Sequence, residues 1–265
     1  MQRCTVPILI ALPVLGVAFF WIVPPIPQPQ WYHNFADQRS LFGIPNFWNF
    51  ISNLPFLLVG GSGIWCLASG RSTERFQDST ERWTYLLLFA AIALTGVGSA
   101  YYHLEPNNAR LVWDRLPIAI TFMALFAIII AERVSRRTGI LLFVPLVLLG
   151  AATVFYWHLT ESRGRGDLRP YFLSQIYPVL AIPVILWLCP ERYTGTANLY
   201  SAMAWYAGAK LYEFLDKSLY SIGQVVSGHT LKHIGVAVSC YLILSWIRHR
   251  RLVSNATMQS SSANC

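Results

Sequence analysis

The sequence has few charged residues. Only 12% of its 265 residues are charged, whereas 55% are hydrophobic, and the mean hydropathy is +0.44. A soluble domain carries about twice that charged fraction, which excludes an ordinary soluble protein. Apolar stretches of about 20 residues, the length that a helix needs to cross a bilayer, recur along the chain. The sequence therefore predicts an all-α, polytopic membrane protein with one membrane domain.

Cysteine patterns and repeats are also lacking. The five cysteines show neither metal-binding nor disulfide spacing, and no internal repeat or low-complexity segment precedes the polar tail after Arg251. The net charge of +8 does not indicate nucleic-acid binding. The arginines lie in short loops and the tail, where membrane proteins carry their cytoplasmic positive charge.

Seven spans form the predicted core. Six are plain, and a seventh is weaker because Lys210, Glu213 and Asp216 crowd its end. In chain order the seven cover residues 45–68, 83–104, 111–131, 138–157, 170–189, 197–215 and 229–247.

One further helix is expected before the core. The apolar run at residues 7–26 has no small-residue cleavage site and ends in prolines, so we interpret it as retained rather than as a signal peptide. The expected organisation is an N-terminal membrane helix (1–27), an extracytoplasmic loop (28–44), a seven-helix membrane domain (45–250) and a polar cytoplasmic tail (251–265).

The distribution of arginine predicts the orientation. The loops after the first, third and fifth core spans, together with the tail, are richest in arginine, which favours a cytoplasmic position for them and for the C-terminus. The second core span then ends near the outer leaflet, and the third and the last begin there. We expect a multi-pass protein of a bacterial inner membrane.

Polar residues gather at these outer ends. Ser99 and His103 are four residues apart and share a helix face, as do His229 and His233, and Asp114 lies inside the next apolar run. Ionisable residues at membrane depth are costly, and they mark functional sites by default. The simpler interpretation is that these side chains only form hydrogen bonds between helices. That interpretation explains a single histidine better than it explains two histidine-containing pairs together with an aspartate.

This set of residues suits metal-assisted hydrolysis. Three neutral imidazoles from His103, His229 and His233 leave a fourth zinc position for water, whose pKa then falls to about 7. Asp114 would accept a proton and pass it to a leaving amine, while Ser99 would donate to a developing oxyanion.

The spacing of these residues resembles that of the alkaline ceramidases. Their pattern is Ser-x-x-x-His, an Asp eleven residues later, and His-x-x-x-His at the last helix, and the run from Asn46 to Leu54 also resembles their first core helix. This family belongs to a superfamily of seven-helix hydrolases and receptors that includes the adiponectin and progestin receptors. The resemblance covers residues 45–250.

The resemblance implies a function. It implies a zinc site at His103, His229 and His233, with Ser99 and Asp114 completing a catalytic group that hydrolyses ceramide or a related N-acyl lipid to fatty acid and amine. Lipid and bilayer are the implied partners, and no obligatory protein partner is evident. The acidic calcium site of animal members is not reproduced, because only Asp37 lies nearby and Asn46 replaces a glutamate, so calcium regulation stays open. The remaining pattern resembles bacterial members.

Further polar residues are candidates to support the site. Asp216 is placed to orient His229, whereas Asn49 and Asn53 share a helix face with Asn46 and suit hydrogen bonds between helices.

Two alternative functions remain. A receptor-like lipid-binding protein would keep the zinc site with little turnover. A di-iron hydroxylase or desaturase needs about eight histidines, and this chain has six.

Overall fold

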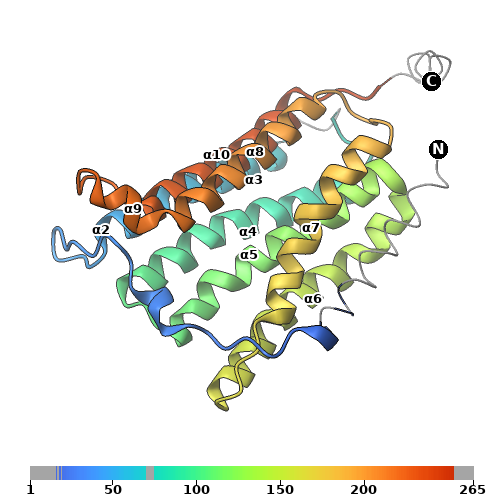
Figure 1. Ribbon diagram of the computed structural model, residues 1–265. Coiled ribbons are helices and arrows are strands. Elements are labelled where there is room, and N and C mark those ends of the chain that lie inside the picture. Colours follow the sequence, from blue (N-terminus) through green and yellow to red (C-terminus); the bar gives the residue numbers. More distant parts are fainter. Residues whose placement is uncertain (1–15, 17, 19, 70–74, 254–265) are drawn as a thin grey trace.

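The computed structural model describes residues 16, 18, 20–69 and 75–253, which form helices joined by short loops (Figure 1). Most of the predicted N-terminal helix and nearly all of the predicted tail lie outside these residues, although residues 20–22 are helical. The described residues pair as extended chain only in two isolated bridges, Leu41 with Ile44 and Tyr193 with Leu252. The prediction of an all-α protein is confirmed.

Seven long helices form the described bundle, and they correspond to the seven predicted core spans. They are α3 (Leu54–Ala68), α4 (Ser79–Leu104), α5 (Asn108–Ile129), α6 (Arg136–Ser162), α7 (Arg169–Leu188), α8 (Thr196–Phe214) and α10 (Gly228–His249). Shorter elements lie between or before them: η1 (Gln30–His33), α2 (Phe47–Ile51), the π-helical turn η3 (Ile130–Val134) and α9 (Asp216–Ser221).

Six spans in the described part of the chain are long and apolar enough to cross a membrane, when α2 with α3 and α5 with η3 each count as one. The protein is therefore polytopic. Helix α8 has 19 residues, but it is not among the six, because its charged end lowers its hydropathy. The first core span was predicted as one continuous helix, whereas a turn at Ser52 and Asn53 separates α2 from α3. Pro55, at the start of α3, suits this break.

Two capped helix starts fix the level of the polar residues. Asn107 caps α5 by accepting a hydrogen bond from the backbone N–H of Arg110 (2.9 Å), and Ser227 caps α10 by accepting one from Thr230 (3.1 Å). Pro106 lies before the first of these caps and separates α4 from α5. The sequence thus ends α4 and begins α5 within a few residues, so their polar ends meet.

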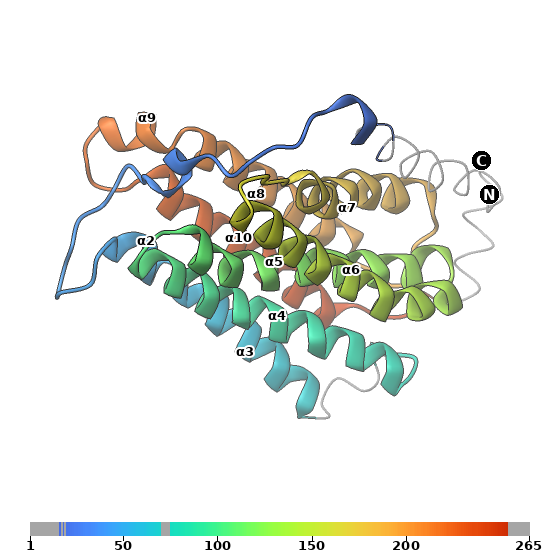
Figure 2. The same cartoon turned by 90° about the horizontal axis from the view of Figure 1, so that it is seen from below.

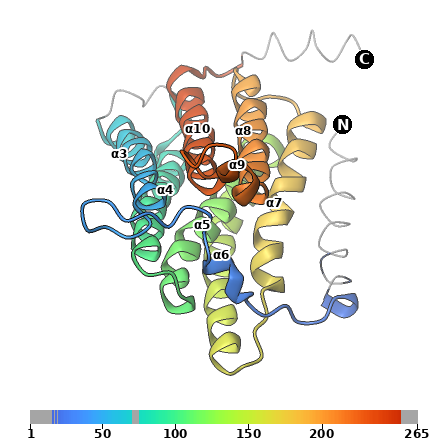
Figure 3. The same ribbon diagram turned by 60° about the vertical axis from the view of Figure 1, so that its left-hand side comes forward.

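Helix α5 lies at the centre of the bundle and packs against α4, α6 and α7 (Figure 1). Helix α10 lies between α3 and α8 (Figure 3). This arrangement brings the end of α4 and the beginnings of α5 and α10 to one end of the bundle, although α4 and α10 are far apart in the sequence.

A segment that we call the N-terminal strap, residues 24–46, crosses this end of the bundle (blue in Figure 2). It begins beside the α6–α7 loop, where Ile26 accepts a hydrogen bond from the Leu168 N–H (2.8 Å). Further along, the Arg39 guanidinium donates to the Val225 carbonyl after α9 (2.8 Å), and at the far end the Asn46 amide donates to the His103 carbonyl (2.9 Å). The predicted loop therefore forms a cover fixed at both ends.

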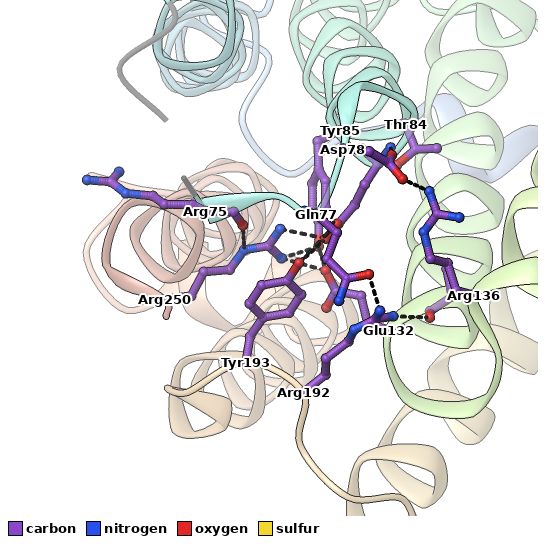
Figure 4. A network of polar contacts seen from close by, with 12 residues as sticks. Arg75, Gln77, Asp78, Thr84, Tyr85, Glu132, Arg136, Arg192, Tyr193 and Arg250 are labelled. Atoms are coloured by element: carbon purple, nitrogen blue, oxygen red, sulfur yellow. Dashed lines mark hydrogen bonds and ion pairs between the residues drawn. The ribbon is translucent and has the colours of Figure 1, made fainter. Parts of the chain in front are cut away.

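The other ends of α4, α5 and α10 meet in a buried polar network (Figure 4). Arg250 donates to the carboxylates of Glu81 and Glu132, and the hydroxyl groups of Tyr193 and Tyr85 donate to the same two carboxylates. From Glu81 to His103, α4 rises about 33 Å at 1.5 Å per residue, about the thickness of the hydrocarbon core. The network and the histidines therefore lie at opposite ends of the bundle, about the thickness of a hydrocarbon core apart.

Candidate metal centre

Three histidines form a compact triangle. The ring centroids of His103 are 5.0 Å from those of both His229 and His233, and the latter two lie 4.8 Å apart. All three side chains are buried, and one nitrogen from each lies within 4.8 Å of the others. Three imidazoles at this separation, shielded from bulk water, form a group that can hold one metal ion.

A glycine contact places the two histidines of α10. A Cβ atom at Gly228 would lie 2.1 Å from the carbonyl oxygen of Tyr212, so only glycine allows α10 to begin this close to α8. The next backbone N–H, that of His229, then donates to Asp216 Oδ1 at 2.7 Å. Asp216 thus supports His229 through its backbone, and its other oxygen accepts from the Ala36 N–H of the strap (3.0 Å).

The surroundings of His233 favour one tautomer. The Ser52 hydroxyl donates to the backbone carbonyl of Asn49 (3.1 Å), and its oxygen lies 2.7 Å from His233 Nδ1. Because the single hydroxyl hydrogen is engaged, the imidazole Nδ1–H donates to the Ser52 oxygen. Nε2 then carries the lone pair that a metal requires. Sequence patterns did not single out Ser52, although it belongs to the run that carried the family resemblance.

The ring of His229 is contacted by a lysine. Lys232 Nζ lies 3.0 Å from His229 Nε2 and also forms an ion pair with Glu213 (3.1 Å). A lysine ammonium has donors only, so Nε2 of His229 accepts from it, and a metal ion bound at Nε2 would have to replace Lys232 there. A second lysine, Lys210, pairs with the same carboxylate.

His103 has fewer polar partners. Its Nδ1 is buried and has no hydrogen-bond partner among the described residues, while its backbone carbonyl accepts from the Asn46 amide (2.9 Å). An unpaired buried ring nitrogen is costly, and a metal ion held by the triangle would explain its retention.

Ser99 and Asp114 meet between α4 and α5, one helical turn from His103. A Cβ atom at Gly98 would lie 2.0 Å from the Trp113 carbonyl oxygen, so this glycine allows α4 and α5 to approach closely. The neighbouring side chains then form a hydrogen bond, which the Ser99 hydroxyl donates to the Asp114 carboxylate. Ser99 lies one helical turn before His103, so the Ser99–Asp114 pair lies at the same end of the bundle as the histidines.

The two asparagine candidates differ in position. Asn49 contacts the site, because its backbone carbonyl accepts from Ser52 and its side-chain oxygen accepts from Thr230 on α10 (2.9 Å). Asn53 instead donates to carbonyl groups within its own segment, those of Asn49 and Phe50. Of these two side chains, only that of Asn49 forms a hydrogen bond to α10 in the described structure.

The strap supplies a residue that sequence reasoning missed. The ring of Phe35 lies 4.6 Å from that of His103 and 4.5 Å from that of His229, measured between centroids. Phe35 is buried although it lies in a polar, proline-punctuated loop, where no periodicity marks it as a core residue. It covers the triangle on the strap side and restricts access from water.

Asp37, the acidic residue nearest to the expected calcium position, is engaged by protein groups. Both of its oxygens accept from the Arg39 guanidinium (2.9 and 2.6 Å). Burial alone would raise the pKa of Asp37, but the hydrogen bonds from Arg39 bring it below its ordinary value. The Asn46 amide, at the position of the missing glutamate, is engaged with His103. The Asp37 carboxylate is therefore already engaged, and Asn46 has no carboxylate to bind calcium.

Comparison with known proteins identifies the family. The model of the family described as Ceramidase matches residues 42–215, more than half of the chain. The chain belongs to the ceramidase family. Ser99, His103 and Asp114 lie in the matched range, whereas His229 and His233 come after it and are joined to the site by the fold. No curated protein matches the chain.

Membership of the ceramidase family implies a hydrolase that acts on an amide bond, with a lipid substrate. The membrane helices place that chemistry in a bilayer. The donor set is suited to metal-assisted hydrolysis, because three imidazoles can hold a metal ion while a hydrogen-bonded carboxylate lies within reach.

Proposed function

We propose that this protein is a zinc-dependent intramembrane amidase that cleaves ceramide or a related N-acyl lipid to a fatty acid and an amine. The observation that carries this proposal is the buried triangle of His103, His229 and His233 beside a hydrogen-bonded Ser99–Asp114 pair. Three nitrogen donors with no carboxylate among them suit zinc better than calcium or magnesium, which prefer oxygen ligands.

A zinc ion bound at the triangle supplies a Lewis acid, which polarises the amide carbonyl and makes water acidic enough to react near neutral pH. Asp114 accepts a proton from the attacking water as the water oxygen bonds to the carbonyl carbon. It then gives that proton to the nitrogen, and the C–N bond breaks. The products are a carboxylic acid and an amine, so all atoms of water are accounted for.

Ser99 has two successive partners in this scheme. In the resting arrangement its hydroxyl donates to Asp114 and orients the carboxylate. Once Asp114 is protonated, the new carboxyl O–H donates to the Ser99 oxygen instead. The serine hydrogen is then free for the negative oxygen that develops on the substrate carbonyl.

The surroundings favour entry from the membrane. Phe35 and the strap cover the triangle on the side of the outer surface, so a lipid reaches it laterally between helices. The arginine distribution supports a cytoplasmic C-terminus and a site toward the non-cytoplasmic surface. We propose a bacterial inner membrane as the location.

The test is fatty-acid release, measured by mass spectrometry, from purified protein given a panel of ceramides and other N-acyl lipids. Wild-type protein should bind about one zinc ion per chain and release fatty acid. The variant His233→Ala and a chelator-treated sample should lose release while remaining folded. Full activity in either control would refute the metal-dependent mechanism. Zinc binding without turnover of any lipid would favour the receptor-like alternative. Iron in the purified protein, together with a requirement for oxygen, would favour the hydroxylase alternative.

A further inference from the structure

A second polar group lies on the other side of α5 from the Ser99–Asp114 contact. Arg115 directly follows Asp114, and its side chain is buried at 4% exposure. One of its terminal nitrogens, Nη2, donates to the Gln28 side-chain oxygen of the strap at 2.6 Å. The other, Nη1, has no hydrogen-bond partner among the described residues.

No described carboxylate forms an ion pair with Arg115. Aromatic rings surround it instead: its guanidinium carbon lies 4.3 Å from the ring centre of Trp157, 4.9 Å from Tyr171 and 5.5 Å from Tyr32. Arg250, at the opposite end of the bundle, is equally buried but is paired with two glutamates. Burial of a cation without an anion is costly, so Arg115 lacks a partner that Arg250 has.

A second unpaired donor lies against the first. The indole N–H of Trp157 is buried and has no acceptor in the described part of the chain, and this ring is the one nearest to Arg115. A tryptophan that is fully buried usually finds an acceptor for its N–H. Two adjacent donors, one of them charged, therefore lack an acceptor at the same place.

These donors are close to the proposed catalytic group. Trp157 and Tyr171 belong to the same buried cluster as Phe35, whose ring packs on His103. Arg115, which lies 4.9 Å from the centre of the Tyr171 ring, directly follows Asp114 in the chain. A lipid cleaved at the histidine triangle would thus have part of its structure within reach of Arg115.

From this geometry we infer that Arg115 and Trp157 form a binding site for an anionic oxygen group of a lipid, which lies beside the cleavage site. The inference rests on the proposed function for its choice of ligand. Two sources supply the same chemistry: the carboxylate of the released fatty acid, or an acidic group on the amine half of the substrate. Guanidinium and indole N–H groups both donate to such oxygens.

The test measures binding to full-length protein in nanodiscs. The probes are palmitate for the released acid, N-palmitoylglycine for an acidic amine half, and hexadecanol as the uncharged control. The variants are Arg115→Gln, which removes the charge, and Trp157→Phe, which keeps a ring but removes the N–H. Arg110→Gln is the matched control on the same helix, because its guanidinium lies at the surface against Tyr101 and Glu105.

We expect both site variants to weaken binding of at least one acidic probe about tenfold or more, as for loss of a charge-assisted hydrogen bond. Hexadecanol binding should stay unchanged throughout, and Arg110→Gln should behave as wild type. If the site variants lose affinity for palmitate alone, the ligand is the product carboxylate. If they lose affinity for N-palmitoylglycine alone, the ligand is the acidic group of the substrate.

Equal binding of all probes in wild type and both variants would overturn the inference and assign the two donors to buried water. Arg115→Lys guards against a folding defect, because it keeps the charge and should retain part of the affinity; a loss as complete as in Arg115→Gln, in a folded protein, would also count against the site. Binding that depends on Arg115, in a protein that hydrolyses no lipid, would leave this inference standing while the proposed function fails.

Discussion

The three histidines differ in what holds them. His233 is oriented by Ser52 through its ring, and His229 is supported by Asp216 through its backbone. His103 relies on ring packing, because Phe35 lies 4.6 Å away and its Nδ1 is unpaired among the described residues. A ligand with its second nitrogen hydrogen-bonded binds metal in a fixed orientation, so the contacts on α10 matter most for affinity.

Ser52→Ala should therefore weaken zinc binding about 10- to 100-fold, as is typical when a hydrogen bond to a ligand imidazole is removed. Ser52→Thr keeps the hydroxyl and is the matched control. Competition with a chelator of known affinity measures the effect. Equal zinc affinity in Ser52→Ala and wild type would show that Ser52 does not orient His233.

Much of the site could be predicted at the scale of single residues. Ser99, His103 and Asp114 are polar groups in or beside apolar runs, and that contrast is visible in the sequence. Phe35 could not be predicted, because an apolar side chain in a loop becomes meaningful only when the loop lies across the histidines. Asn53 was a candidate on helical spacing, and its amide donates to the Asn49 carbonyl, so its part in the site stays a prediction.

At the scale of helices, one glycine sets the distance between α4 and α5. Gly98→Ala would place a Cβ atom 2.0 Å from the Trp113 carbonyl, where no flexible side chain can give way. The helices must separate, at a cost of about 1–3 kcal/mol, and the Ser99–Asp114 hydrogen bond should break.

Gly61→Ala on α3 is the matched control, because nothing lies within 4 Å of its added Cβ and alanine favours a helix. Thermal unfolding and fatty-acid release measure the two effects. Gly98→Ala should lower both the Tm and the activity, whereas Gly61→Ala should lower neither. Similar behaviour of the two variants would contradict the close approach at Gly98.

The strap is held by a titratable residue. His33 Nδ1 lies 2.8 Å from the Tyr102 hydroxyl, and Nε2 lies 2.8 Å from the Asn108 side-chain oxygen. Burial lowers the pKa of His33 below its ordinary value of 6.5, Arg115 lowers it further, and the Asn108 hydrogen bond and Glu161 oppose this. The neutral imidazole is therefore the form that docks best.

Since the pKa of His33 is lower when the strap is docked than when it is free, docking is strongest above pH 6.5 and weakens as the pH falls through the docked-state value. Hydrogen exchange of residues 28–46 should increase at pH 5.5 relative to pH 7.5, after correction for intrinsic rates. His33→Gln keeps polar contacts without titrating and should reduce that difference. An equal difference in the variant would assign the pH response to other groups.

The elements themselves were largely predictable. Seven core helices follow from the apolar runs, and their starts follow from capping residues such as Asn107 and Ser227. The break between α2 and α3 and the short helix α9 were not predicted, because a turn within an apolar run and a single helical turn in a polar loop leave weak periodic signals. The path of the strap depends on long-range contacts that no local pattern contains.

At the scale of the whole molecule, the histidines with Asp114 and the Arg250 network lie at opposite ends of α4, α5 and α10, and Figure 4 shows the network. The network should contribute stability rather than chemistry. Arg250→Ala would leave Glu81 and Glu132 buried without their cation, at a cost of about 3–5 kcal/mol. The folded fraction should keep its activity, because about 33 Å of α4 separates the two ends.

Denaturant unfolding together with activity per folded molecule measures this separation. Arg251→Ala is the matched control, since the neighbouring arginine is exposed, and it should alter stability by less than about 0.5 kcal/mol. A loss of activity in folded Arg250→Ala, with stability unchanged, would contradict a purely structural role.

The histidine triangle also constrains how the protein is made. His103 lies on α4, and its two partners lie on α10, well over a hundred residues later. At ordinary rates of synthesis, on the order of ten seconds pass between their emergence from the ribosome. Most of the bundle is therefore made before two of the three histidines exist, so a metal ion bound by the triangle would be captured late in biogenesis, and the nascent chain would lack the proposed hydrolytic centre until then.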